Sequence, residues 1–352
     1  MKKKSNILLA LLVSTLGISG ISNAKDDITS REILTLSDFN KEVSSDTTVK
    51  RKEVTFINNK LKMAGIIFSP ANLDEGKKYP SVVVLHPGGG IKEQTASLYA
   101  YRLAQQGFVA LAFDASHQGA SEGEPRFLEN PIERVEDVRS AVDYLTTISY
   151  IDRERIGALG ICAGGAYAIA ATITEKRIKA VVSVSAVNIG DGFRKGWLAN
   201  TPVSEQLATL KAIADKRTEI ANGKDQTMVN YVPETVDKST PHDLVEATAY
   251  YRTEARWKHA NAPNTMLFTS IDKIFAFDAY QGIETLLTQP LLLIAGSKAE
   301  SLWHSQRAYK LAKSPKELFL VKGGTHMSLY DKDVMKVIPK ISQFFNKNLA
   351  SK

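Results

Sequence analysis

The sequence predicts an α/β fold, in which a doubly wound, mostly parallel sheet carries a helical cap insertion. Two observations lead to this prediction. Short, continuously apolar runs, which are typical of buried strands, alternate with stretches of helical periodicity. In addition, the glycine-rich segment Gly160–Gly165 directly follows one of these runs and precedes a helix of small residues. The 352-residue chain is long enough for one large domain of this kind.

The expected elements follow one another through residues 50–350. A hairpin at the sheet edge is expected from Val54–Ile57 and Leu61–Phe68. The runs that indicate buried strands are Ser81–His86, Phe108–Phe113, Ile156–Leu159, Ala180–Ser185, Leu291–Gly296 and Leu318–Lys322. Helices are expected near 92–106, 132–147, 166–171, 302–312 and 332–349. Strands and helices that alternate in this way favour a parallel sheet with helices on both faces.

Residues 186–289 interrupt this alternation and are too many for a bare loop. They contain the helix-like stretches Val203–Asn222 and His242–Ala255, together with many aromatic residues. Both ends of the segment join strands at the edge where the glycine-rich turn lies. We therefore expect a cap over the carboxyl ends of the strands, with a separately packed subdomain as the alternative.

The first 24 residues have the pattern of a secretory signal peptide. Lys2–Lys4 are basic, Ile7–Ile21 are mostly apolar, and Ser22–Ala24 form a small-x-small cleavage site. The apolar run is short for a membrane span, which needs about 20 residues. The pattern predicts bacterial export, a periplasmic or secreted protein, and no stable membrane anchor after cleavage, with a retained anchor as the alternative. Residues 25–49 are expected to form a linker.

Charge and motifs exclude several classes of partner. The formal net charge is +7, and it falls to +4 without residues 1–24, which contribute three lysines and no acidic residue. The remaining basic residues are dispersed and do not interleave with aromatic residues, so a nucleic-acid partner is not expected. The sequence has no HExxH, CxxC or phosphate-binding glycine loop. We expect no metal and no cofactor, and the oligomeric state stays open.

Cys162 is the only cysteine of the chain, and it stands in a Gly-x-Cys-x-Gly turn between a strand and a helix. In such a tight turn the residues two before and two after the centre must lack side chains, and Gly160 and Gly164 meet this demand. A lone cysteine in an exported protein is a candidate reactive thiol. We expect Cys162 to be a nucleophile. The alternative is a small buried apolar residue in an ordinary turn.

A thiol nucleophile needs a base, and the base needs an acid that orients it. Among the histidines that follow Cys162, only His326 lies in a glycine-rich loop between a late strand and the last helix. We expect it to be the base, with a loop histidine that caps that helix as the alternative. Glu300, just after the strand Leu291–Gly296, is the expected acid, and Asp191 is the alternative. A pairing of Glu300 with His304 on one helical face would instead be structural.

Two backbone amides are expected to bind the oxyanion of the reaction. One belongs to Ala163, directly after the nucleophile. The other comes from the loop His86–Gly90; Pro87 has no amide hydrogen, so Gly88 is the expected donor, with Gly89 as the second choice. The alternative is a glycine-rich turn without a catalytic amide.

Residues 50–350 resemble the α/β-hydrolase superfamily, and most closely its dienelactone-hydrolase-like branch with a cysteine nucleophile. The resemblance rests on short motifs: Ile151-Asp152-x-x-Arg155-Ile156-Gly157, the Gly160–Gly165 turn, Asp114–Gly123, Gly296–Glu300 and Gly324-Thr325-His326. Members of that superfamily carry nucleophile, acid and histidine in this order. Glu300 stands where the branch more often has Asp, and His-Pro-Gly replaces the commoner His-Gly start of the oxyanion loop.

The resemblance implies an enzyme that hydrolyses carboxylic esters, thioesters or lactones through an acyl-enzyme, with a small acyl compound as substrate. Two other functions remain open. An acyltransferase would use the same residues but pass the acyl group to an alcohol or amine. A non-catalytic binding or redox-sensing protein would use Cys162 only as an oxidisable thiol.

Overall fold

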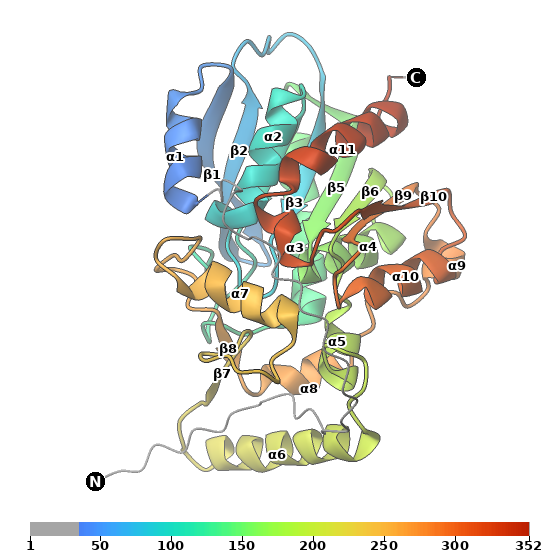
Figure 1. Cartoon of the computed structure of the whole chain (residues 1–352). Helices are drawn as coiled ribbons and strands as arrows, with labels where there is room; N and C mark the ends of the chain where they lie inside the picture. The colour runs from blue at the N-terminus through green and yellow to red at the C-terminus, as the bar shows by residue number, and fades with distance from the viewer. Residues whose placement is uncertain (1–34, 352) are drawn as a thin grey trace.

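The computed structural model of the chain describes residues 35–351 (Figure 1). At its centre lies an eight-stranded sheet with the order β1-β2-β4-β3-β5-β6-β9-β10. Strand β2 runs antiparallel to β1 and β4, and the other neighbouring strands are parallel. This sheet confirms the predicted fold class. The strands are β1 Val49–Asn58, β2 Leu61–Pro70, β3 Tyr79–Leu85, β4 Val109–Phe113, β5 Ile151–Ile161, β6 Ile178–Val184, β9 Leu291–Gly296 and β10 Lys316–Val321.

Apolar side chains from the strands fill a core on each face of the sheet. In β3, Val83 and Leu85 face one core, whereas Val82 and Val84 face the other. This alternation follows from the two-residue period of a strand, and an all-apolar run is required because both faces are covered.

Helices cover both faces of the sheet (Figure 1). On one face lie α2 and α11, and on the other lie α3, α4 and α10. A π-helical turn, Lys92–Ala96, leads into α2, and a 3-10 turn, Met327–Tyr330, precedes α11. The helices span Ser97–Gln105 (α2), Pro131–Thr147 (α3), Ala163–Thr174 (α4), Leu302–Leu311 (α10) and Val334–Asn348 (α11).

Part of the expected linker is instead a helix. Residues Leu36–Ser45 form α1, which begins after the N-cap Thr35, whose side chain accepts the amide hydrogen of Asp38. Phe39 is buried, and its ring packs against Tyr101 and Trp257 at centroid distances of 5.8 and 5.7 Å. A helix this short owes its stability to such tertiary contacts, which the sequence pattern does not reveal. Residues 25–34 and the expected signal peptide lie outside the described residues.

Between β6 and β9, the structure places a group of helices and one small antiparallel ribbon. We call residues 186–289 the cap. Its elements gather mainly at the lower end of the molecule (Figure 1), and the ribbon β7–β8 lies among them. The cap elements are α5 Ile189–Lys195, α6 Val203–Ala221, β7 Met228–Asn230, α7 His242–Arg252, β8 Thr265–Leu267, α8 Ser270–Phe275 and α9 Ile283–Leu286.

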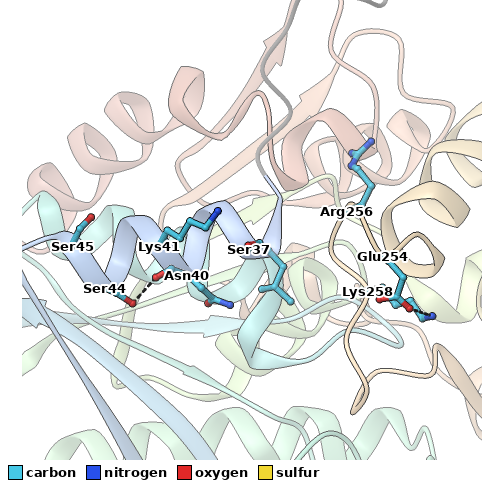
Figure 2. A pocket seen from close by; sticks show the side chains of 9 residues that line it. Ser37, Asn40, Lys41, Ser44, Ser45, Glu254, Arg256 and Lys258 are labelled. Atoms are coloured by element: carbon cyan, nitrogen blue, oxygen red, sulfur yellow. Dashed lines mark hydrogen bonds and ion pairs between the residues drawn. The ribbon is translucent and has the colours of Figure 1, made fainter.

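An open surface groove of about 690 Å³ lies between α1 and the loop that follows α7. Figure 2 shows its mostly polar lining, which includes Ser37, Asn40, Lys41, Ser44, Glu254, Arg256 and Lys258. Phe39, Trp257, Tyr250 and Tyr330 form a continuous series of ring contacts, and none of these rings lines the groove.

From residue 35 to residue 351, no helix has both the length and the apolar character that a membrane crossing requires.

Replacement of Phe39 by alanine should test whether α1 belongs to the folded domain. We expect the free energy of unfolding to fall by about 3 kcal/mol, because a buried phenylalanine that becomes alanine leaves a cavity. Urea unfolding followed by circular dichroism would measure it. Lys41→Ala, on the exposed side of the same helix, is the control and should change it by less than about 0.5 kcal/mol. Equal effects of the two substitutions would contradict a packed role for α1.

Candidate active site

Cys162 lies at the sharp turn between β5 and α4, with the unusual backbone angles φ 57° and ψ −122°. A Cβ atom at Gly160 would lie 2.0 Å from the carbonyl oxygen of Gly164. A Cβ atom at Gly164 would lie 2.5 Å from the carbonyl oxygen of His86. Neither contact is possible, so only glycine at both positions lets the strand and the helix meet. The turn holds a non-glycine residue at positive φ, which costs on the order of 1–3 kcal/mol.

The thiol of Cys162 is surrounded by hydrogen-bond donors. The backbone amides of Ala163 and Gly88 both lie within hydrogen-bonding reach of the sulfur, as does the hydroxyl of Tyr330. Burial nevertheless raises the pKa of the thiol above its usual value, and the three donors only partly offset this effect. The residue at rest is therefore a neutral thiol at neutral pH.

The loop that carries Gly88 is fixed by buried polar groups. Nε2 of His86 accepts the amide hydrogen of Ala115 at 3.1 Å, so Nδ1 carries the proton and donates to the Pro87 carbonyl oxygen at 2.7 Å. Below the loop, the carboxylate of Asp114 accepts the amide hydrogen of Lys92 and binds its ammonium group, both at 2.7 Å. These contacts hold the loop in place before any ligand binds.

The cap closes over this loop through Tyr231. A Cβ atom at Gly88 would lie 3.1 Å from the Tyr231 ring, and one at Gly89 only 2.6 Å from it. The Tyr231 hydroxyl donates to the buried carboxylate of Glu129 at 2.8 Å. Tyr167 donates to the same carboxylate at 2.6 Å. A residue of the cap thus packs directly on the expected oxyanion loop.

His326 lies on the loop after β10 and is almost fully buried. Its Nδ1 lies 2.6 Å from the hydroxyl oxygen of Ser301, and its Nε2 lies 3.1 Å from the hydroxyl oxygen of Tyr330. The edge of the ring also meets Trp197 of the cap, at a centroid distance of 5.1 Å. Burial lowers the pKa of His326 to about 3, so the imidazole is neutral at rest and can accept a proton.

The structure does not bring Glu300 to the imidazole ring. Its two carboxylate oxygens accept the amide hydrogens of His242 and Asp243, at 3.1 and 3.0 Å. These amides are the unpaired donors at the start of α7, so Glu300 caps that helix, which favours a negative charge there. The next residue, Ser301, holds the position beside Nδ1 where we expected the acid.

Asp191, the alternative acid, is also engaged elsewhere. Its buried carboxylate pairs with Lys195 and Arg307, each at 3.0 Å. His304, the other partner considered for Glu300, is buried and its ring stacks on Trp303 at a centroid distance of 3.5 Å.

Asp243, from the first turn of α7, is a site residue that the sequence reasoning missed. Its Oδ1 accepts the amide hydrogen of His326 at 3.3 Å, and its Oδ2 accepts that of Ser301 at 3.2 Å. The indole N–H of Trp197 also donates to Oδ2, at 3.3 Å. The buried carboxylate thus lies behind both the histidine and its serine partner. Nothing in the local sequence indicates this, because Asp243 is remote along the chain and belongs to the cap.

Tyr330 is the second missed residue. Its hydroxyl lies 3.1 Å from Nε2 of His326 and also neighbours the Cys162 thiol, whereas no direct hydrogen bond joins the thiol to the imidazole in the part of the chain that the structure describes. The four-residue spacing of His326 and Tyr330 is the signal that could have found it, because that spacing puts two side chains on one side of a helical turn.

One group of side chains approaches the geometry of a metal site. Ligand atoms of His242, Asp243 and Glu246 lie within 4.8 Å of one another. Both oxygens of Asp243 already accept hydrogen bonds, and His242 is exposed. These contacts account for Asp243 without an ion.

Family comparisons match two overlapping parts of the chain. The Dienelactone hydrolase family matches residues 63–189, and the family described as BAAT / Acyl-CoA thioester hydrolase C terminal matches residues 135–248. The first match contains the Gly160–Gly165 turn and the Gly88 loop, and the second extends into the cap as far as α7.

Individual proteins give longer matches. The uncharacterized protein YcjY of Escherichia coli K12 is 42% identical over 303 residues, which cover 84% of this chain and 99% of that protein. The crystal structure of the hypothetical protein PA2218 from Pseudomonas aeruginosa superposes with a TM-score of 0.82 at 32% identity, covering 86% of this chain and 95% of that one. The thiohydrolase aneE of Aspergillus aculeatus is 28% identical over 185 residues, or 53% of this chain and 57% of that protein.

The raised pKa of the thiol predicts how Cys162 reacts with iodoacetamide. Less thiolate forms at a given pH when the pKa is raised, so alkylation should continue to accelerate above the usual thiol pKa of about 8.5. Mass spectrometry of the protein after timed exposure from pH 6 to 10 would locate the inflection. The same protein in urea is the control, with an inflection near the usual value. An inflection in the folded protein at or below that of the protein in urea would contradict this assignment.

Proposed function

Because the chain belongs to the α/β-hydrolase superfamily, in its dienelactone-hydrolase-like branch, we propose that it cleaves esters, thioesters or lactones through an acyl-enzyme on Cys162. The family makes it a hydrolase that acts on ester or thioester bonds. The nucleophile, the roles of the other residues and the export of the protein are the parts that we propose.

The observation that carries the proposal is that the Cys162 sulfur, at the strained turn between β5 and α4, lies within reach of the amides of Gly88 and Ala163. When the sulfur attacks a carbonyl carbon, the carbonyl oxygen becomes an oxyanion close to the sulfur. Both amides are already held in place there, one by the Gly88 loop and the other by the first turn of α4. Each donor of this kind lowers the barrier by about 3 kcal/mol.

His326 is the base of the proposed reaction. Its neutral imidazole takes the thiol proton as Cys162 attacks and gives a proton to the leaving group as the tetrahedral intermediate collapses. In the second half of the reaction it takes a proton from water, which attacks the acyl-enzyme and releases the acid. Ser301 at Nδ1 fixes the orientation of the ring, and the carboxylate of Asp243 supplies negative charge behind it.

A thiol nucleophile favours substrates with a good leaving group. From the tetrahedral intermediate, the thiolate of Cys162 leaves more easily than an amine, so amides return to starting material. A thioester competes on equal terms, because its own leaving group is also a thiolate. The family matched at residues 135–248 and the thiohydrolase among the relatives support thioesters and activated esters as substrates.

We also propose that the protein acts in the bacterial periplasm or outside the cell. The basic start, apolar run and small-x-small site within residues 1–24 support export. The full-length chain expressed in a bacterium should appear in the periplasmic or secreted fraction without residues 1–24. Mature protein that stays in the cytoplasm would contradict this.

A trapped acyl-enzyme would test the central step. We expect p-nitrophenyl acetate to release one equivalent of nitrophenolate per protein in a rapid burst, with the added acetyl mass on the peptide that contains Cys162. Cys162→Ala should abolish both signals, and hydrolysis that continues unchanged in this variant would falsify the proposed nucleophile. Adding an alcohol or amine separates the two enzyme classes, because an acyltransferase would form the new ester or amide in place of free acetate.

Substitutions of Asp243 and of Glu300 should have different effects on kcat/KM. We expect Asp243→Asn to lower kcat/KM roughly 10–100-fold, equivalent to about 1.4–2.7 kcal/mol, because the charge behind His326 is lost as the imidazolium forms. Glu300→Gln should lower kcat/KM less than about 3-fold and reduce stability by about 1 kcal/mol, as expected for a weakened helix cap. Steady-state kinetics and urea unfolding on both variants would measure this. A larger catalytic loss in Glu300→Gln would return the acid role to Glu300.

A further inference from the structure

We propose that Tyr330 is a catalytic residue that relays the proton between Cys162 and His326 through its phenol hydroxyl. This inference rests on the proposed function, in which Cys162 is the nucleophile and His326 the base. It adds a third group to the transfer, at a position that neither the resemblance nor the sequence pattern assigns.

The geometry places Tyr330 in the path of the proton. Its hydroxyl oxygen lies 3.1 Å from Nε2 of His326 and also contacts the Cys162 thiol. Ser301 lies 2.6 Å from the other ring nitrogen. When Nδ1 carries the ring proton and donates it to Ser301, Nε2 accepts from Tyr330. The phenol oxygen, which also neighbours the Tyr251 hydroxyl, can then accept from the thiol.

The surroundings hold the phenol in this position. Tyr330 is 2% exposed, and its ring meets Tyr250 edge to face at a centroid distance of 5.3 Å. Within the short turn Met327–Tyr330, the carbonyl oxygen of Leu329 accepts the hydroxyl of Tyr99 at 2.7 Å. The ring therefore cannot swing away from Cys162 unless α7 also moves, so a direct approach of thiol and imidazole requires a larger rearrangement than a relay does.

The transfer balances as an exchange of two protons. As the sulfur forms its bond to the carbonyl carbon, the thiol proton passes to the phenol oxygen, and the phenol proton passes to Nε2. The products are a tetrahedral oxyanion whose carbon is bonded to the Cys162 sulfur, a neutral phenol and an imidazolium ion. The reverse exchange delivers a proton toward the leaving group. The phenol is never left as an anion, which agrees with a buried site where the pKa of Tyr330 is raised well above its usual value.

Solvent isotope effects on acylation test the relay in Tyr330→Phe, which keeps the ring and removes only the hydroxyl. The rate of the nitrophenolate burst is measured in mixtures of H₂O and D₂O and across pH 6–9. In the wild type, the transfer of two protons in one step should make the burst rate a curved function of the deuterium fraction of the solvent. In Tyr330→Phe, the burst should slow by about 100-fold, the typical size of a lost general acid–base contribution. Its rate should also rise with pH as hydroxide takes over the deprotonation.

Tyr250→Phe is the matched control. It is the same substitution in the same aromatic cluster, but among the described residues the Tyr250 hydroxyl makes no hydrogen bond to Cys162, Tyr330 or His326. It should leave the burst rate within about twofold and the deuterium dependence curved, since neither proton of the relay passes through it. Melting curves of both variants separate a loss of packing from a loss of the hydroxyl. Site-specific 3-fluorotyrosine at position 330 adds a variant with the hydroxyl present, and it should keep the curved dependence.

The outcomes distinguish the relay from the function on which it rests. The relay would be overturned if Tyr330→Phe acylates at the wild-type rate or faster with the same isotope dependence. In that case the Tyr330 side chain only blocks direct contact between the thiol and the imidazole. A wild-type protein that hydrolyses esters without any acyl group on Cys162 would overturn the proposed nucleophile, and the relay with it.

Discussion

At the end of β5 the backbone comes so close to the first turn of α4 that a side chain at position 160 would collide with the carbonyl of Gly164. This contact fixes where Cys162 projects and where the Ala163 amide points. It also brings α4 against the end of β3, from which the Gly88 loop starts, since a side chain at Gly164 would collide with the carbonyl of His86. The thiol and both amides therefore share one geometric origin in the packing of a strand against a helix.

The other half of the site depends on the contact between the cap and the core. Glu300, from the loop after β9, accepts the first amide hydrogens of α7, while Asp243 of α7 accepts the backbone amide hydrogens of His326 and Ser301. The carboxylate of the core thus accepts hydrogen bonds from the cap, and the carboxylate of the cap accepts hydrogen bonds from the core, at the same junction. Because the cap is joined to the core by these hydrogen bonds, its position and that of the His326 backbone are set together.

The sequence predicted what is encoded within a few neighbouring residues. Apolar runs and glycine spacing predict the sheet, the turn that carries Cys162, and the loops that carry Gly88 and His326. The surroundings of the imidazole could not be predicted in this way, because Asp243 is 83 residues away from His326 along the chain. The position of Glu300 after β9 predicts it as the acid, but the neighbouring Ser301 stands beside Nδ1 because the side chain of Glu300 turns toward α7. Helix α1 could not be predicted from local sequence either, because it is stabilised by a contact between Phe39 and the distant Trp257.

Burial also sets the charge of the site before substrate arrives. It raises the pKa of Cys162 and lowers that of His326, so both groups favour their neutral forms. A carboxylate against Nδ1 would stabilise a preformed thiolate–imidazolium pair, but a neutral serine hydroxyl is there instead. Charge separation is then best stabilised when an oxyanion forms between the Gly88 and Ala163 amides, because these donors act on the developing charge. A thiol that stays neutral until a carbonyl group reaches those amides is also less exposed to oxidation, because the thiolate is the form that oxidants attack.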